Sequence, residues 1–445
     1  MPPSSISRRH FLEAAGAILL LGGCRRRAEK PNVLLLTLDT TRADSLGCYG
    51  YARPTSPNLD RLASQSTQYT RATASSSWTL PAHASIFTGK FTASHGACYD
   101  PEGPLLLSQA IEGPWRQYRA RGLSSEERTL ATILKEAGYA TGAVVGGPWL
   151  KRVFGLDRGF DYYDDDQISE VNGRRADQIT PTALRWIERG DRARPFFLFL
   201  NYFDPHAPYR APDPVTTRFI TPGRTPSEPE EIRALYDAEI YFMDYHIGRL
   251  LDGLRKLGVY DGTLMVVTSD HGELLGEHGQ FGHGNYLYQE ELAVPLLVRH
   301  PAGEVKPGRS EAPVQHPDLL PMILERLSIP PPSGIQGGVP PALGHPIVAE
   351  VYPLSFSAPE GHWRALRHGN FKFLWNSRGQ HQLYNLKDDP REERNLITRE
   401  SERAKKMETY LLKYLASLPS PGAAGQPTPI DDETLRALKS LGYVQ

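Results

Sequence analysis

Between residues 32 and 39 the chain reads NVLLLTLD, and between residues 264 and 272 it reads LMVVTSDHG. Each stretch is a nearly unbroken apolar run, which is typical of a parallel strand buried on both faces of a sheet. The first run ends in Asp39, and the second ends in Asp270, which is followed at once by His271. The two stretches therefore predict neighbouring strand ends that present acidic and imidazole side chains.

Other apolar strands alternate with helical patterns along the chain. These elements are the strands 141–145, 196–201 and 294–298 and the helices 57–62, 82–88, 130–137 and 231–257. Such alternation predicts an α/β fold, in which a mainly parallel mixed sheet is sandwiched by helices. Ligands of these sheets bind beyond the carboxyl ends of the strands. We therefore expect a catalytic domain over residues 31–330 with its site at that edge.

The composition changes after residue 330. Residues 330–341 are rich in proline and glycine, which marks a boundary. We expect a smaller α+β subdomain over residues 331–418, and then a linker and a terminal helix over residues 419–445. The predicted elements of this part are short antiparallel strands at 363–373 and 381–385 and helices at 400–418 and 431–441.

The N-terminal segment, residues 1–30, carries a targeting pattern. The pair Arg8 and Arg9 precedes an apolar stretch, residues 14–23, that is too short to span a bilayer as a helix. The stretch leads into LGGC, which ends at Cys24. This order indicates twin-arginine export and acylation of Cys24. We expect an exported lipoprotein on the periplasmic or cell-surface face of a membrane, with a plain uncleaved apolar N-terminus as the alternative.

The charge balance bears on the binding partners, and the cysteine content bears on disulfide formation. The chain has 50 Lys and Arg against 51 Asp and Glu, a formal net charge of −1, and no basic run past the N-terminus. This balance suggests no nucleic-acid partner. Cys48 and Cys98 could form a disulfide outside the cytoplasm, but two buried thiols are the favoured interpretation.

Asp39, Asp270 and His271 together offer carboxylate oxygens and an imidazole, a set suited to a divalent cation. A salt bridge or a helix cap is the alternative for such a pair of residues. Thr79 opens TLPAH at the start of a helix, where backbone amides favour an anion. Its hydroxyl becomes a nucleophile if coordination to a dication lowers its pKa. A helix N-cap is the alternative role for Thr79, and both roles are compatible.

Several ordered blocks of sequence together resemble the sulfatase family of the alkaline phosphatase superfamily. The resemblance covers roughly residues 31 to 400, and it implies that family's fold and a metal-dependent hydrolase of esters. The blocks are DTTRAD (39–44), TLPAHASIFTG (79–89), FGLDRGFD (154–161), HAPY (206–209), SDHGE (269–273), GEHG (276–279), GHG (282–284) and LYNLKDDP (383–390).

The chain departs from the family's pattern at four positions. The family typically has cysteine or serine where Thr79 stands, and arginine where His83 stands. Threonine cannot give the formylglycine aldehyde of typical sulfatases, and it resembles relatives that attack phosphorus. Thr40 replaces a second metal-binding acid, and His283 replaces a lysine. Since the site loses a carboxylate and gains imidazoles, zinc or manganese is favoured, with calcium or magnesium as alternatives.

The resemblance also implies a role for each candidate site residue. One divalent metal ion is expected on Asp39, Thr79, Asp270 and His271. Thr79 is the expected nucleophile and His206 the general acid, because histidine titrates near working pH. His83 and His283 are expected to contact non-bridging oxygens of the substrate, and Arg42 to steady the anion or to position Asp39. For Arg42 and His283 a purely structural role is the favoured alternative.

The leading hypothesis is cleavage of a phosphoester, phosphodiester or phosphonate ester through a covalent Thr79 intermediate. The alternatives are a sulfuric ester hydrolase without formylglycine, a two-metal phosphatase and a non-catalytic anion-binding lipoprotein. The substrate is expected to be a small molecule or a glycan or lipid ester. The C-terminal hairpin and the 99–124 insertion are expected to form the substrate pocket. Within the insertion, Trp115 and Tyr118 either stack on the substrate or pack in a lid.

Overall fold

The computed structural model of the protein describes residues 30–99, 120–168, 173–220, 227–352 and 361–421. The export pattern with Cys24, the pair Trp115 and Tyr118, and the helix predicted at 431–441 lie outside these residues. Within the described ranges, no helix is both long enough and apolar enough to cross a membrane.

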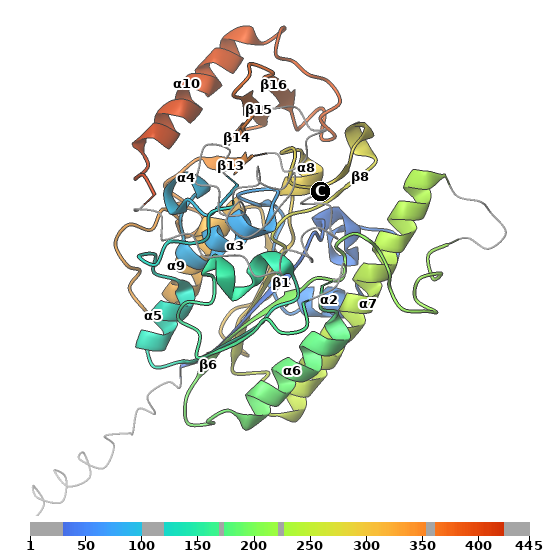
Figure 1. Ribbon diagram of the computed structural model, residues 1–445, viewed down its shortest axis with the longest axis vertical. Coiled ribbons are helices and arrows are strands. Elements are labelled where there is room, and N and C mark those ends of the chain that lie inside the picture. Colours follow the sequence, from blue (N-terminus) through green and yellow to red (C-terminus); the bar gives the residue numbers. More distant parts are fainter. Residues whose placement is uncertain (1–29, 100–119, 169–172, 221–226, 353–360, 422–445) are drawn as a thin grey trace, which may run out of the picture.

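The main sheet has eight strands, and β1 lies at its centre (Figure 1). Its order is β11 (Gly308–Ser310), β2 (Thr67–Tyr69), β10 (Leu296–Arg299), β7 (Thr263–Thr268), β1 (Asn32–Leu38), β6 (Phe196–Tyr202), β4 (Ala140–Val144) and β5 (Tyr162–Asp164). β1 pairs in parallel with both β6 and β7, whereas β10 runs antiparallel to β7 and β2. The predicted α/β class with a mainly parallel mixed sheet is therefore confirmed.

Successive side chains of β1 belong to two different cores, which explains the unbroken apolar run. Val33 and Leu35 pack with α3 (Thr79–Thr88), α5 (Leu130–Glu136) and α9 (His316–Arg326) on one face. Leu34 and Leu36 pack with α2 (Pro57–Ala63), α6 (Ala176–Arg189) and α7 (Glu228–Lys256) on the other face. With 0–1% exposure of these four side chains, both faces of the strand are closed to water.

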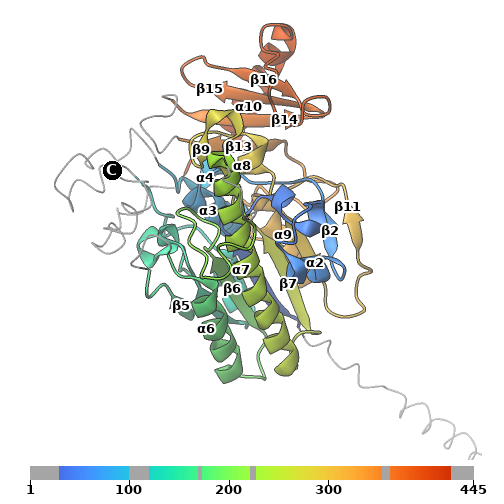
Figure 2. The same ribbon diagram turned by 90° about the vertical axis from the view of Figure 1, so that its right-hand side faces the viewer.

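A second sheet of four antiparallel strands caps one end of the molecule, together with α10 (Ser401–Ser417) (Figures 1 and 2). Its strands are β13 (Ile347–Val351), β14 (Trp363–His368), β15 (Phe371–Asn376) and β16 (Gln382–Asn385). Leu366, Phe373 and Leu411 form its own buried core. This unit is the predicted C-terminal α+β subdomain. The remaining short strands and α-helices of the described residues are β3 (Ala72–Thr73), β12 (Val314–Gln315), β8 (Leu274–Leu275), β9 (Phe281–Gly282), α4 (Thr92–His95) and α8 (Gln289–Leu292).

The sequence patterns missed some elements. Helices α6 and α9 were not predicted, and each carries an internal proline, Pro181 or Pro321, that weakens a helical pattern. The strand predicted at 363–373 is two strands joined by a turn, and β13 adds a third that was missed. Helix α3 begins at Thr79 rather than at 82, because a proline in the first turn costs the helix no hydrogen bond.

Candidate active site

Asp39 and Asp270 lie at the same edge of the main sheet. Asp39 follows β1 and Asp270 follows β7, and the two parallel strands are in register up to Thr37 and Thr268. Asp39, Asp270 and His271 are completely buried, and one potential ligand atom from each lies within 4.8 Å of the others. The structure thus brings the three residues together at the carboxyl ends of the strands.

Thr79 joins this group from the start of helix α3. The preceding Trp78 has an extended backbone, so the first turn of the helix begins at Thr79. The Thr79 hydroxyl oxygen lies 3.2 Å from Nε2 of His271. Because the N-terminal turn of a helix has unpaired backbone N–H groups and a positive dipole end, an anion is favoured beside Thr79. We call Asp39, Asp270, His271 and Thr79 the catalytic centre.

The atoms that face one another in the catalytic centre are hydrogen-bond acceptors. Nδ1 of His271 lies 2.9 Å from the carbonyl oxygen of Gly272, to which it must donate, so Nε2 carries the lone pair. Oδ1 of Asp39 and Oδ2 of Asp270 are buried without a hydrogen-bond partner in the described part of the chain. Buried acceptors without donors are costly, and a cation satisfies all of them at once. The donor set therefore fits a divalent metal ion.

The electrostatics of the centre agree with this fit. Burial raises the pKa of Asp39 well above its ordinary value, and the neighbouring Asp270 raises it further. Burial also lowers the pKa of His271 to about 3, which keeps the imidazole neutral and able to act as a ligand. A bound cation would offset the repulsion between the two carboxylates.

Asn201 holds Asp39 in place and is not among the site residues predicted from the sequence. Its amide nitrogen lies 3.3 Å from Oδ2 of Asp39 and 3.2 Å from the Thr37 hydroxyl. Its amide oxygen accepts hydrogen bonds from the backbone N–H groups of Gly146 and Gly147. The only available signal was an amide side chain within the otherwise apolar strand FFLFLNY of β6.

Asp270 is held by backbone N–H groups. Its Oδ1 accepts from the amide of Thr40 at 3.2 Å and from the amide of His271 at 2.9 Å. The φ angle of Thr40 is positive and lies in the left-handed region, which a threonine rarely adopts. This turn aims the Thr40 amide at Asp270, so the loop after β1 fixes the acid that follows β7.

His83 lies one helical turn after Thr79 and is completely buried. Its Nδ1 lies 2.8 Å from the carbonyl oxygen of Thr79, and its Nε2 lies 2.9 Å from the Thr37 hydroxyl. Both ring nitrogens thus have partners in the protein. This differs from the predicted contact with substrate oxygens, which needs a ring nitrogen that faces the substrate. The observed contacts link α3 to β1 beneath the centre.

His206 belongs to the loop that follows β6. Its ring stacks on Phe203 at a centroid distance of 4.4 Å, and its Nδ1 lies 2.6 Å from the carbonyl oxygen of Ala207. The centroid of the His283 ring lies 4.9 Å away. Burial lowers the pKa of His206 well below its ordinary value, and the neighbouring His283 lowers it further.

His283 lies between His206 and the catalytic centre. The centroid of its ring is 4.4 Å from that of His271, and its Nδ1 lies 3.1 Å from a carboxylate oxygen of Glu273. Glu273 is completely buried and orients the imidazole. The structure therefore places both predicted histidines, His206 and His283, beside His271.

Arg42 has a different environment from the one predicted. Its guanidinium donates to the carboxylates of Asp44 and Glu277, each at 2.7 Å, and to the carbonyl oxygen of Glu273. Two carboxylates already neutralise its single charge. These ion pairs join the loop after β1 to the 273–277 segment and fit the structural role that was favoured for Arg42, while its contact with a substrate anion stays a prediction.

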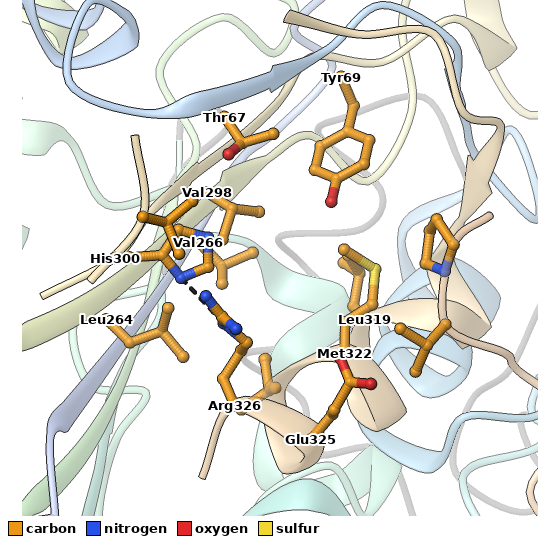
Figure 3. Close-up of a pocket in the computed structure, with 14 residues that line it drawn as sticks. Thr67, Tyr69, Leu264, Val266, Val298, His300, Leu319, Met322, Glu325 and Arg326 are labelled. Atoms are coloured by element: carbon orange, nitrogen blue, oxygen red, sulfur yellow. Dashed lines mark hydrogen bonds between the residues drawn. The ribbon is translucent and has the colours of Figure 1, made fainter. Parts of the chain in front are cut away.

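A separate cavity of about 230 Å³ lies between α9 and the main sheet (Figure 3). Leu264, Val266, Val298 and Leu319 supply apolar walls, and Arg326 donates to His300 at its side. None of the catalytic-centre residues lines it, so it is not the site of the chemistry. Cys48 and Cys98 are not joined in a disulfide, as the favoured interpretation expected, but both thiols are half-buried rather than buried, which corrects that interpretation.

Comparisons with known proteins agree with the fold. A model of the sulfatase family matches residues 31–329, and a model of the N-sulphoglucosamine sulphohydrolase C-terminal region matches residues 276–419. The N-acetylglucosamine-6-O-sulfatase of Bacteroides thetaiotaomicron is 24% identical over 518 residues, covering 89% of this chain and 88% of that protein.

Two further matches complete the comparison. The N-sulphoglucosamine sulphohydrolase of Homo sapiens is 30% identical over 351 residues, covering 71% of this chain and 64% of that protein. The solved phosphonate monoester hydrolase of Agrobacterium radiobacter shares the fold with a TM-score of 0.68 at 21% identity, over 87% of this chain and 95% of that one. The chain therefore belongs to the sulfatase family of ester hydrolases.

Proposed function

We propose that this protein is a metal-dependent hydrolase that cleaves a phosphoester, phosphodiester or phosphonate ester through a covalent intermediate on Thr79. The observation that carries the proposal is the position of the Thr79 hydroxyl, 3.2 Å from Nε2 of His271 in a centre where Asp39 and Asp270 each keep one buried carboxylate oxygen without a hydrogen-bond partner among the described residues. A side-chain alcohol in this place has the geometry of an activated nucleophile.

Asp39, Asp270, His271 and Thr79 would hold one divalent cation. When bound, the cation supplies positive charge that lowers the pKa of the Thr79 hydroxyl and neutralises the oxygens of the ester. Two carboxylates with one imidazole favour zinc or manganese, and calcium or magnesium are the alternatives.

The chemistry of the chain's own residues then follows in two steps. The Thr79 hydroxyl first releases its proton to solvent; its oxygen then attacks phosphorus, a new Thr79 O–P bond forms, and the bond between phosphorus and the leaving alcohol breaks. His206 gives a proton to the leaving oxygen from Nε2, because its Nδ1 is directed at the Ala207 carbonyl. In the second step His206 takes a proton from a water molecule, the water oxygen bonds to phosphorus, and the Thr79 O–P bond breaks; the released Thr79 oxygen takes up a proton from solvent. In both steps His283 would contact the non-bridging oxygens.

The lowered pKa of His206 fits the second step better than the first. A neutral imidazole is ready to accept a proton from water, whereas the donor form requires a negative charge nearby. An anionic ester bound beside His206 and His283 supplies this charge. Glu273 behind His283 would keep that ring oriented through the cycle.

The residue at the nucleophile position favours phosphorus over sulfur. Thr79 cannot be converted into the formylglycine aldehyde that typical sulfatases use, and His83 stands where their arginine would be. The fold shared with a phosphonate monoester hydrolase supports the same direction. We infer a small-molecule, glycan or lipid ester as the substrate.

A substrate panel with a nucleophile variant tests the proposal. We expect turnover of aryl phosphate, phosphodiester or phosphonate esters to exceed that of aryl sulfate, and Thr79→Ala to abolish it without loss of the fold. A quenched reaction should contain a protein species whose mass is increased by one substrate phosphoryl or phosphonyl group at Thr79. Thr88→Ala is the matched control, because Thr88 is also buried on α3 but donates only to the Ala84 carbonyl.

The results that would contradict the proposal are equally definite. Substantial activity in Thr79→Ala would eliminate Thr79 as the nucleophile. A chain that binds no metal and turns over no ester would favour the non-catalytic anion-binding alternative. Two tightly bound ions per chain would favour the two-metal phosphatase.

A sulfuric ester hydrolase with unmodified Thr79 is the second candidate function. The relatives favour it, because the N-acetylglucosamine-6-O-sulfatase and the N-sulphoglucosamine sulphohydrolase are both named for sulfate substrates. A higher kcat/KM on aryl sulfate than on every phosphorus ester, with a sulfated Thr79 in the quenched protein, would establish this alternative.

We also propose that the protein is exported and held to a membrane by a lipid on Cys24. The support is the order of Arg8 and Arg9, the apolar stretch 14–23 and Cys24 in the sequence. Membrane fractionation of cells that express the full chain tests it. We expect Cys24→Ser to move the protein from the membrane to the soluble fraction, and an unchanged distribution would contradict the anchor.

A further inference from the structure

The edge strand β5 and helix α6 lie side by side (Figure 2), and residues of both line a polar groove. Its volume is about 600 Å³, a size typical of small-ligand sites. No residue of the catalytic centre lines it. Its lining residues are Tyr162, Asp164, Asp166, Gln167, Arg174, Asp177, Gln178, Pro181, Thr182, Arg185, Trp186 and Arg189. We call this feature the β5–α6 groove.

Two aromatic rings side by side form part of its wall. The rings of Tyr162 and Trp186 stack with centroids 6.4 Å apart and an angle of 25° between their planes. Gly142 makes this arrangement possible, because a Cβ at that position would lie 2.6 Å from the indole ring. Tyr162 is paired with Gly142 across β4 and β5 and remains 36% exposed. The indole therefore lies over the glycine and extends the surface of the tyrosine.

Polar side chains surround the aromatic pair. Arg174 donates to Asp164 at 2.6 Å and to the Thr182 hydroxyl at 3.1 Å, and Tyr162 donates to Asp164 at 2.8 Å. The Arg174 side chain is 5% exposed, yet its Nε has no hydrogen-bond partner within the described residues. A buried N–H without a partner is costly, so it indicates a place for an acceptor on a ligand.

The charges of the groove balance. Three aspartates and three arginines line it, together with Gln167 and Gln178. The lining therefore attracts neither anions nor cations in bulk, and it offers many donors and acceptors on planar side chains. These groups match the paired hydroxyls of a sugar, while the C–H face of a sugar ring packs on an aromatic ring.

We propose that the β5–α6 groove binds the sugar rings of a glycan. The lining residues of α6 run from Asp177 to Arg189, almost the whole length of the helix, so the groove is long enough for several linked rings. β5 is the edge strand of the sheet, and β4 and β6 separate it from β1. The groove is thus a binding site separate from the catalytic centre, and it would hold a glycan on the protein whichever ester the centre cleaves.

Affinity electrophoresis of the full chain tests this proposal. Native gels are cast with dextran, mannan, galactan, laminarin or chondroitin sulfate, and the mobility is compared with that in a gel without polysaccharide. We expect at least one polysaccharide to retard the protein and Tyr162→Ala to weaken its binding by roughly tenfold. Gly142→Ala should have a similar effect, because the new methyl group displaces the Trp186 indole.

Two variants serve as controls. Tyr245→Ala removes another exposed tyrosine, 54% exposed on α7 and outside the groove, and should leave the retardation unchanged. Thr79→Ala should also retain the retardation, which separates groove binding from binding at the catalytic centre. If Thr79→Ala is inactive but still retarded, the groove proposal stands on its own.

The proposal is overturned if no polysaccharide retards the wild-type protein. It is equally overturned if Tyr162→Ala and Gly142→Ala are both retarded like the wild type while their circular dichroism shows a native fold. Retardation by chondroitin sulfate alone that disappears with added salt and is unaffected by Tyr162→Ala would indicate bulk charge attraction and would also overturn it.

Discussion

At the carboxyl ends of β1 and β7 the side chains of the catalytic centre are completely buried, whereas the β5–α6 groove is lined largely by side chains that reach solvent. The centre depends on acceptors whose cost only a bound cation would remove, and its parts are fixed by backbone N–H groups and by Asn201. The groove depends on shape and on several donors and acceptors whose opposite charges balance. Changing a single atom of the catalytic centre should therefore alter metal binding and turnover. Changes in the β5–α6 groove should alter only the affinity for a large ligand.

The largest effect is expected when one carboxylate of the centre is removed. Asp270→Asn should reduce bound metal from about one ion per chain to almost none, and reduce turnover by roughly a thousandfold or more. The physical reason is that the amide lowers the charge of the ligand set. Metal analysis of the purified protein and initial rates on the preferred ester measure the two effects.

Asp237→Asn is the matched control for this experiment. Asp237 on α7 is also a fully buried aspartate, but it pairs with Arg53 and Tyr51. The control should keep its metal. Chelation should lower the melting temperature of the wild type, because Oδ1 of Asp39 and Oδ2 of Asp270 then face each other without a cation. A metal content near one in Asp270→Asn, or a melting temperature indifferent to chelation, would contradict the proposed ligand set.

An intermediate effect is expected from Asn201→Ala, because the substitution removes the donor that orients Asp39. Partners of metal ligands typically contribute about 10- to 100-fold to metal affinity or activity, and we expect a loss in that range. Competition with a chromogenic chelator gives the affinity. Asn32→Ala is the control, since Asn32 accepts from the Phe196 amide at the other end of the same strand pair. A metal affinity equal to that of the wild type in Asn201→Ala would show that Asp39 needs no such support.

The sequence predicts the catalytic centre better than the groove for a physical reason. Asp39, Asp270 and His271 each end an apolar run, so their position at one edge of the sheet follows from the strands alone. Thr79 follows from the start of a helix. The register of β1 against β7 then places these residues together.

The contacts between side chains could not be predicted from the sequence. Which atoms His83 and Arg42 contact depends on the distance between α3, β1 and the 273–277 segment, and no pattern encodes those distances. Asn201 was not predicted because a single amide side chain in an apolar strand forms no repeating sequence pattern. The groove was hidden because α6 was missed, and because Gly142 and Trp186 meet only in the folded chain.

A smaller effect concerns the ion pairs beside the centre. Burial raises the pKa of Glu277, but Arg42 outweighs it and lowers that pKa from 4.5 to about 2. Because the pKa is lower in the folded state, ionised Glu277 stabilises the fold. This contribution is fully present above pH 4.5 and is lost as the pH falls towards 2. Glu277→Gln should therefore lower the melting temperature by roughly 2 °C at pH 7, and by less at pH 3.

Thermal denaturation at several pH values measures this difference. Asp44→Asn is the comparison, because Asp44 also pairs with Arg42 but its side chain is 65% exposed. An exposed ion pair contributes little to stability, so Asp44→Asn should lower the melting temperature by less than Glu277→Gln does at pH 7. If the difference in melting temperature between wild type and Glu277→Gln grew as the pH fell, its sign would contradict a stabilising role of ionised Glu277.

The smallest expected effect is the coupling between the centre and the groove. β4 connects them, because the amides of Gly146 and Gly147 just beyond its end hold Asn201, while Gly142 within it lies beneath Trp186. Tyr162→Ala removes side-chain atoms without touching β4, so it should leave kcat/KM on a small aryl ester within about twofold. The double variant with Asn201→Ala should then be additive within about 0.5 kcal/mol. A larger coupling energy would mean that β4 transmits binding in the groove to Asp39, and that the two regions work as one site.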